Sequence, residues 1–158
     1  MNRAQVITIS DRVATGAMRD ASGPAVVALL KQGVFEVTGP VVVPDDSMLI
    51  TDAIMSAVLG GAALVVTTGG TGLGPRDVTP QTTATLFDYE VPGIGEQMRR
   101  AGVASTPMAA LSRAMAGVVG RTLVINLPGS VNGATESLEA VMPIIGHAVQ
   151  LLAGDTAH

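Results

Sequence analysis

Residues 62–80 read AALVVTTGGTGLGPRDVTP, and this stretch decides how the rest of the chain is interpreted. Its first five residues form an apolar run with the length and composition of a buried strand. Four glycines then fall within residues 69–74, where the backbone can bend sharply and approach a ligand without a Cβ in the way. The following Thr79-Pro80 is typical of a helix start. The order strand, glycine loop, helix predicts an α/β unit with a ligand-binding loop at the carboxyl end of the strand.

The chemistry of this loop points to a phosphorylated ligand. Successive N–H groups in a glycine-rich loop can form a concave nest for anions. Arg76 could hold a phosphate, and Asp77 could hold a metal ion. The loop is not a Walker A motif, because no Gly-Lys-Ser/Thr follows it. A tight turn that only packs a strand against a helix remains the alternative.

Apolar runs alternate with helical patterns along the whole chain, which predicts a three-layer α/β fold with a mostly parallel sheet. No linker, repeat or low-complexity tract divides the sequence, so residues 1–158 are expected to form a single domain. We expect strands at about 6–10, 35–43 and 62–66, and a hairpin over 117–126 that turns near Gly120-Arg121. We expect helices at about 22–32, 47–59, 79–86, 95–101 and 134–152, with a turn or helix over 107–113.

The chain has an unusually high share of apolar residues and few charged ones. Hydrophobic residues make up 47% and charged residues 14%, against roughly 25% charged in typical soluble domains. A sheet covered on both faces and apolar surface hidden in an oligomer would both produce this composition. A transmembrane helix over the uncharged residues 53–75 competes, but Gly60-Gly61 divides that stretch. The N-terminus leads directly into a strand, so we expect a cytoplasmic protein with no membrane partner.

Composition also excludes several function classes. The absence of cysteine rules out disulfides, thiolate metal sites and cysteine nucleophiles, and two histidines cannot form a histidine-rich metal centre. A net charge of −4, with only three aromatic residues, argues against nucleic-acid binding. Any anionic ligand must therefore be held by local geometry.

Four loops should meet at the carboxyl edge of the predicted sheet. They are Ser10-Asp11-Arg12, Pro44-Asp45-Asp46, residues 67–77 and residues 126–130. Asp45 and Asp77 would then converge on the anion nest, and two carboxylates beside a phosphate require a cation. Mg²⁺ commonly bridges carboxylates and substrate phosphates, although the two could instead act as a general acid/base pair.

At the remaining polar positions, a purely structural role competes with a role in ligand binding. Asp46 fits a helix cap, and Ser10 and Asp11 fit a polar turn as well as a ligand contact. Ser112 and Arg113 fit a cap or a phosphate clamp.

These segments together resemble the MoaB/Mog family of molybdenum-cofactor biosynthesis proteins, in order and spacing across nearly the whole chain. The matching segments are Ile9-Ser10-Asp11-Arg12, Val43-Pro44-Asp45-Asp46, Thr67-Thr68-Gly69-Gly70-Thr71-Gly72, Pro75-Arg76-Asp77-Val78-Thr79-Pro80, Pro92-Gly93-Ile94-Gly95-Glu96, Leu111-Ser112-Arg113 and Asn126-Leu127-Pro128-Gly129. The resemblance implies a molybdopterin-binding α/β fold, usually a homotrimer. It implies molybdopterin adenylyltransferase activity, in which Mg²⁺, ATP and molybdopterin give adenylylated molybdopterin and pyrophosphate. A molybdenum-insertion protein would use the product.

By position, Asp45 and Asp77 match the family's two functionally important aspartates, which we expect to be catalytic and to bind Mg²⁺. The expected substrate- and nucleotide-binding residues are Ser10, Asp11, Thr68, Gly69, Gly70, Thr71, Gly72, Arg76, Glu96, Ser112, Arg113, Pro128, Gly129 and Ser130. The chain departs from many relatives at Ser130-Val131-Asn132-Gly133, where a basic residue is missing. That departure favours the alternative of a non-catalytic molybdopterin-binding carrier or assembly subunit. An unrelated nucleotide-binding domain that shares only the loop physics is a third interpretation.

Overall fold

The structure is a computed structural model that describes residues 1–156. It contains a six-stranded sheet in the order β2-β1-β3-β6-β5-β4. Strands β2, β1, β3 and β6 are parallel, and the hairpin strand β5 runs antiparallel to both β6 and β4. The strands are β1 (Asn2–Ile9), β2 (Phe35–Val43), β3 (Leu64–Thr68), β4 (Tyr89–Glu90), β5 (Ala116–Val119) and β6 (Thr122–Leu127). The predicted mostly parallel α/β fold is confirmed.

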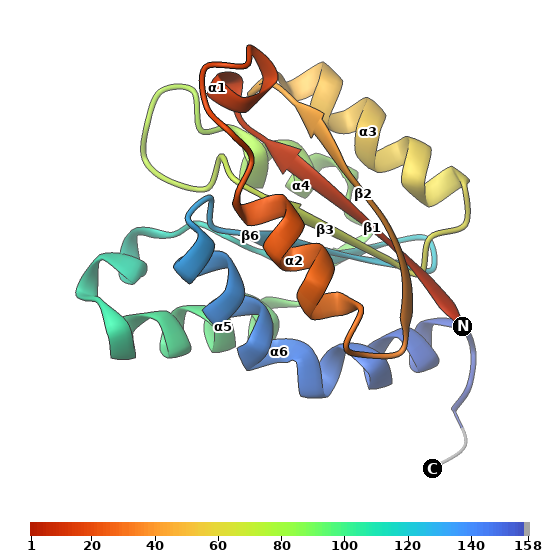
Figure 1. Cartoon of the computed structure of the whole chain (residues 1–158). Coiled ribbons are helices and arrows are strands. Elements are labelled where there is room, and N and C mark those ends of the chain that lie inside the picture. The colour runs from red at the N-terminus through yellow and green to blue at the C-terminus, as the bar shows by residue number, and fades with distance from the viewer. Residues whose placement is uncertain (157–158) are drawn as a thin grey trace.

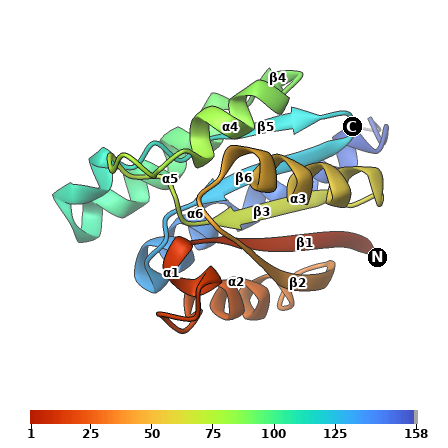
Figure 2. The same cartoon turned by 90° about the horizontal axis from the view of Figure 1, so that it is seen from above.

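Helices cover both faces of the sheet (Figures 1 and 2). They are α1 (Asp11–Ala14), α2 (Ser22–Leu30), α3 (Ser47–Leu59), α4 (Thr79–Leu86), α5 (Pro92–Ser105), the 3-10 helix η1 (Pro107–Leu111) and α6 (Val131–Leu152). Helices α2, α5 and α6 bury Leu30, Met98 and Leu138 against one face. Ile50 and Ile54 of α3, with the end of α4, cover the other face. The low charge content therefore follows in part from a sheet that is hidden on both sides.

Most predicted elements are present, and the differences lie at their ends. Helix α5 begins at Pro92, three residues before the predicted start at residue 95, because proline is well suited to the first turn of a helix. Ser22 is of a residue type that caps helices, but it is the first residue of α2, and its Oγ accepts a hydrogen bond from Thr68 Oγ1 at 3.1 Å. Asp46 does cap α3, since its Oδ1 accepts the Leu49 N–H at 3.0 Å. The short elements α1 and β4 were not predicted.

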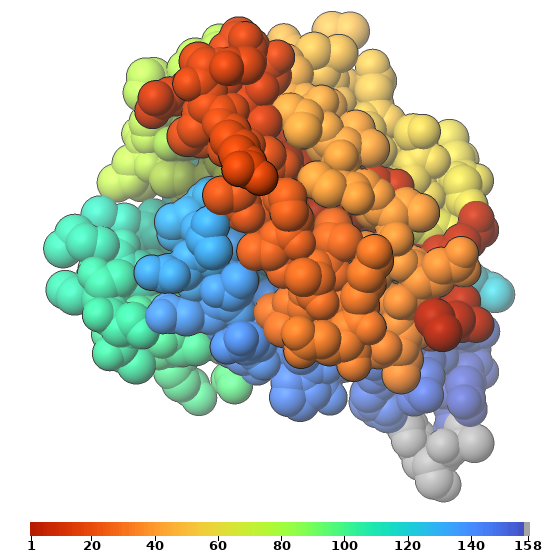
Figure 3. Space-filling model, viewed as in Figure 1, coloured from red at the N-terminus to blue at the C-terminus, as the bar shows by residue number. Residues whose placement is uncertain are grey.

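The topology places a crevice at one edge of the sheet. Strand β1 lies between β2 and β3, so the chain leaves β1 on one side through α2 and returns on the other through α3. In parallel sheets, ligands bind at the carboxyl ends of the strands where such a switch occurs. Here the glycine loop meets α1 and the start of α6, as the light-green, red and blue segments of Figure 3 show. Within residues 1–156, no helix is long and apolar enough to cross a membrane.

Candidate functional site

The glycine loop is anchored to its neighbours at its entry. Gly69 donates its N–H to the Leu127 carbonyl at 3.0 Å, which ties the end of β3 to the end of β6. Gly69 has φ +104° and is packed against the Ile9 carbonyl, and Gly70 has φ +68°. Side chains other than glycine adopt such backbone conformations only at a cost. The turn can therefore form only because these positions lack a Cβ.

The next three N–H groups of the loop are unpaired among the described residues, as the predicted nest requires. Gly70, Thr71 and Gly72 donate these groups to no partner within residues 1–156. The carbonyls of Gly70 and Thr71 are occupied instead, by the N–H groups of Thr79 at 3.2 Å and of Arg113 at 2.9 Å. Consecutive unpaired donors in such a turn attract an anion. Gly69, which was expected to contribute, has already given its N–H to Leu127.

Asp11 and Asp45 join two strand ends through paired contacts. The Asp11 N–H donates to Asp45 Oδ2 at 3.0 Å, and the Asp45 N–H donates to Asp11 Oδ1 at 2.9 Å. Arg76 completes this cluster by donating from Nε to Asp11 Oδ2 at 2.8 Å and from Nη2 to Asp11 Oδ1 at 3.1 Å. The loops after β1, β2 and β3 are thus held together, as their place at one sheet edge predicts.

Asp45 is in an unusual environment. Its Oδ1 atom is buried without a hydrogen-bond partner within residues 1–156, and the same is true of Thr79 Oγ1. Both atoms lie against Gly70. Burial raises the pKa of Asp45, and the negative charges of Asp11 and Asp77 add to the rise against the opposing hydrogen bond from Asp11. An unpartnered buried carboxylate oxygen is costly and favours a positively charged or proton-donating ligand.

Asp77 faces the same space from the far end of the glycine loop. Its Oδ2 accepts the Gly74 N–H at 2.9 Å, which fixes the carboxylate in place. No group of three His, Cys, Asp or Glu side chains in the described part of the chain could hold a metal ion. Mg²⁺, however, is usually bound by one or two carboxylates together with substrate phosphates. Asp45 and Asp77 therefore fit Mg²⁺ as a pair that needs a phosphorylated substrate to complete its coordination.

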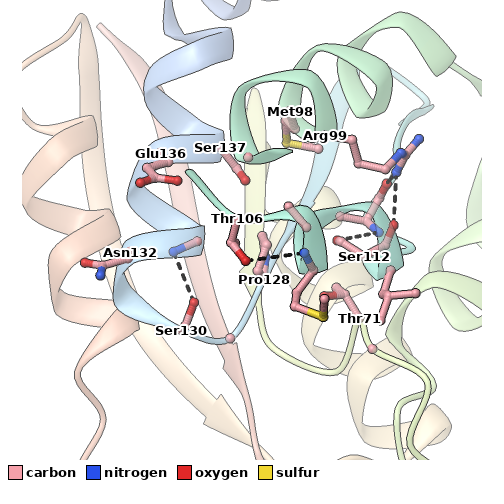
Figure 4. Close-up of a pocket in the computed structure, with 18 of the residues that line it drawn as sticks. Thr71, Met98, Arg99, Thr106, Ser112, Pro128, Ser130, Asn132, Glu136 and Ser137 are labelled. Atoms are coloured by element: carbon pink, nitrogen blue, oxygen red, sulfur yellow. Dashed lines mark hydrogen bonds between the residues drawn. The ribbon is translucent and has the colours of Figure 1, made fainter. Parts of the chain in front are cut away.

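Two cavities open at this edge and share a wall. The first, the α5–α6 cavity, has a volume of about 620 Å³ and lies between α5, η1 and the start of α6 (Figure 4). The second, the α1–α2 cavity, has a volume of about 420 Å³ and lies between β1, the start of α2 and the start of α6. The residues that line both are Gly70, Asp77, Gly129 and Ser130. The site can thus hold two ligands that meet at the glycine loop.

Comparison with known proteins agrees with this geometry. Residues 5–147 match the family described as "Probable molybdopterin binding domain". The chain belongs to the MoaB/Mog family of molybdopterin-binding proteins. Its structure resembles that of the molybdopterin biosynthesis enzyme MoaB from Thermus thermophilus, with a TM-score of 0.92 and 48% identity over 98% of each chain.

Curated relatives of the MoaB/Mog family differ in length. A molybdenum cofactor biosynthesis bifunctional protein from Synechococcus elongatus is 42% identical over 96% of this chain and 47% of its own length. This chain spans about half or less of the first curated relatives that it matches. A molybdopterin adenylyltransferase from Helicobacter pylori is 37% identical over 95% of this chain and 87% of its own.

The structure distributes the predicted MoaB/Mog site residues over three positions. Ser112, Pro128 and Thr71 line the α5–α6 cavity (Figure 4). Ser10 and Thr68 line the α1–α2 cavity. Glu96 is exposed on α5 and lines neither cavity, and Asp11, Arg76 and Arg113 also line neither. The roles of all these residues in binding remain predictions.

Sequence reasoning missed several residues that the fold brings to the site. They are Arg19, Asp20, Thr79, Ser105, Asn132 and Glu136. Asp20 carried a signal, because it stands three residues before Gly23 and accepts that N–H at 3.0 Å. Thr79 and Asn132 lie in segments that the sequence analysis singled out for other reasons, and Arg19, Ser105 and Glu136 are single polar residues that nothing in their local sequence marks.

Arg113 is expected to act as a structural clamp on the glycine loop. Its guanidinium donates to the Gly72 carbonyl at 2.9 Å, to the Asp77 carbonyl at 2.8 Å and to Gln81 Oε1 at 3.0 Å. We expect Arg113→Lys to lower the free energy of unfolding by about 2 kcal/mol, nearly as much as Arg113→Ala, because lysine cannot supply three planar donors. Urea unfolding measures this loss. If Arg113→Lys instead kept full stability and activity, the residue would be acting through its charge alone.

The Asp11–Arg76 pair should make stability depend on pH. Hydrogen bonds from Arg76 and from the Asp45 N–H lower the pKa of Asp11. A lowered pKa in the folded state contributes stability above the unfolded value of about 3.9, and this stability is lost as the pH falls through the folded value. The free energy of unfolding of wild type should therefore exceed that of Arg76→Ala at pH 6, and the gap should narrow below pH of about 4. The exposed Arg100→Ala serves as the control, and a gap for Arg76→Ala that stays constant with pH would contradict the assignment.

Proposed function

We propose that the chain is a molybdopterin adenylyltransferase, which transfers AMP from ATP to the phosphate of molybdopterin with release of pyrophosphate. The observation that carries this proposal is the wall shared by the two cavities, at Gly70, Asp77, Gly129 and Ser130. A transfer between two bound substrates needs two adjacent sites with the reacting atoms at their junction. Family membership and the adenylyltransferase relative from Helicobacter pylori support it.

In the proposed reaction, an oxygen of the molybdopterin phosphate attacks the α-phosphorus of ATP. A new P–O bond forms, the bond between the α-phosphorus and its bridging oxygen breaks, and pyrophosphate leaves with the electron pair. The attacking phosphate is already anionic, so no general base is required. The protein contributes mainly by positioning the substrates and offsetting charge.

The donors for this charge lie on two sides of the shared wall. The N–H groups of Gly70, Thr71 and Gly72 are unpaired within residues 1–156, and these residues line the α5–α6 cavity. The first-turn N–H groups of Val131 and Asn132, at the start of the 22-residue helix α6, have no partner within residues 1–156. Helix N-termini favour anions. When bound, Mg²⁺ would be held by Asp45 and Asp77 and would neutralise charge on the transferred phosphate.

Pyrophosphate release tests the proposal directly. The protein is mixed with molybdopterin, ATP and Mg²⁺, and pyrophosphate is measured against a reaction without molybdopterin. Release that requires all three components is the expected result. Molybdopterin binding without release would favour the carrier or assembly subunit, an alternative supported by the absence of any Lys or Arg after Arg121.

We further propose that the chain forms a homotrimer and passes its product to a molybdenum-insertion protein. The family resemblance and the low charge content, 14% of residues, support an oligomer that would hide apolar surface. Analytical ultracentrifugation at micromolar concentration tests the trimer, and a monomer there would remove it. A cytoplasmic location likewise stays a prediction from the sequence.

A further inference from the structure

The α1–α2 cavity has an unbalanced set of charges. Three carboxylates line it, from Asp20, Asp45 and Asp77, and Arg19 is the only cation among its lining residues. The loop that follows β6 contributes Gly129, Ser130 and Val131 to the opposite wall and carries no Lys or Arg. An anionic substrate that enters this cavity therefore meets one positive side chain.

Three other arginines near the site, Arg76, Arg113 and Arg99, already have partners. Arg76 is paired with Asp11, and Arg113 donates to carbonyls of the glycine loop. Arg99, the only cation lining the α5–α6 cavity, donates to the Ala114 carbonyl at 2.7 Å. Each of these side chains would have to give up hydrogen bonds before it could bind a substrate.

Arg19 is placed differently. Its side chain is exposed and makes no hydrogen bond to residues 1–156. The backbone on both sides of it is nevertheless held in place. Asp20 accepts Thr8 Oγ1 at 2.8 Å and the Gly23 N–H at 3.0 Å, and the Met18 N–H donates to the Arg12 carbonyl at 3.1 Å. A guanidinium that makes no hydrogen bond to the described residues, on an anchored backbone at a cavity wall, is well placed to bind an anion.

We propose that Arg19 binds a phosphate group of a substrate in the α1–α2 cavity, an inference that rests on the proposed adenylyl transfer. The guanidinium fork matches two phosphate oxygens at once and gives a charge-assisted contact that lysine reproduces only in part. Both oxygens of the adjacent Asp20 accept hydrogen bonds from Thr8 and Gly23, and neither accepts one from Arg19. Arg19 then supplies the positive charge that Arg76 and Arg113 do not.

The test compares Arg19→Ala and Arg19→Lys with Arg121→Ala. Arg121 is exposed in the hairpin turn between β5 and β6, at the opposite edge of the sheet, so its loss changes the net charge equally. Steady-state kinetics gives KM for ATP and for molybdopterin separately, and calorimetry gives the affinity for pyrophosphate with Mg²⁺. We expect Arg19→Ala to raise one KM by about tenfold and Arg19→Lys to raise it less, with an unchanged unfolding transition.

The measurements with ATP or pyrophosphate and those with molybdopterin together identify which substrate carries the phosphate that Arg19 binds. A higher KM for ATP with weaker pyrophosphate binding assigns Arg19 to the nucleotide, and a higher KM for molybdopterin assigns it to the pterin phosphate. Equal behaviour of Arg19→Ala and Arg121→Ala in all three measurements would overturn the proposal. If wild type released no pyrophosphate, the proposed transfer would fail, while calorimetric titration of Arg19→Ala and Arg121→Ala with pyrophosphate and with molybdopterin would still decide the role of Arg19.

Discussion

Replacing Asp77 with Asn is expected to lower kcat by about 10²- to 10³-fold while changing molybdopterin affinity by less than about threefold. The reason is the position of Asp77 in the wall between the two cavities, opposite Asp45. Asn keeps an oxygen that can accept the Gly74 N–H, now made at 2.9 Å, so the loop should keep its shape. Only the negative charge that would hold Mg²⁺ is lost. Pyrophosphate release measures turnover, and pterin fluorescence titration measures binding.

Asp46→Asn provides the matched control for this change. Asp46 is an exposed neighbour of Asp45 that caps α3, and asparagine caps helices as well as aspartate does. We expect it to retain turnover within about twofold and to unfold as wild type does. Equal loss of turnover and pterin binding in Asp77→Asn would show that Asp77 shapes the pocket and does not serve the transfer step.

Replacing Gly69 with Ala is expected to cost about 2–4 kcal/mol of stability. Gly69 has φ +104°, and an added Cβ would collide with the Ile9 carbonyl at the end of β1. Because that obstacle is backbone, it can be relieved only by parting β1 from the glycine loop. The same movement would displace the nest at Gly70, Thr71 and Gly72. Urea unfolding at neutral pH measures the loss, and molybdopterin binding should weaken with it.

Gly93→Ala is the control for the glycine substitution. Gly93 lies in the first turn of α5, where an added Cβ meets nothing within 4 Å and φ is not positive. Alanine favours helices over glycine, so its stability should be unchanged or up to about 1 kcal/mol higher. If Gly69→Ala behaved like Gly93→Ala, the loop would have to be free to move away from β1, and the close packing of the strand ends would not be required.

Much of the fold could be predicted because it is encoded locally. The apolar runs at β3 and β6 are buried throughout, as expected for central parallel strands. Asp46 caps α3 and Pro80 lies in the first turn of α4, as their residue types predict. Errors concentrated at helix ends. Ser22 illustrates why, because a hydroxyl suited to capping α2 was instead used to contact Thr68.

The loops that form the site were predicted, but the hydrogen-bond partners of its side chains were not. The four loops meet as expected, since parallel strands deliver their carboxyl ends to one edge. The roles expected for Arg76 and Arg113 took no account of the partners that the fold gives them. A guanidinium binds whichever oxygens the tertiary structure brings within hydrogen-bonding distance, and sequence patterns carry no such distances. Arg19 was not predicted as a site residue because its distance from the glycine loop cannot be read from the sequence.

The alternation of strands and helices, the glycine loop and the acidic residues at the strand ends can all be read from the sequence alone. These depend on backbone preferences and on burial patterns that are local to a few residues. The pairing of Asp11 with Arg76, 65 residues away, and the contact of Arg113 with Gly72, 41 residues away, are set by the three-dimensional fold. Such pairings follow from strand order and helix packing. They fix which polar atoms are occupied, which remain for a ligand, and where the two cavities meet.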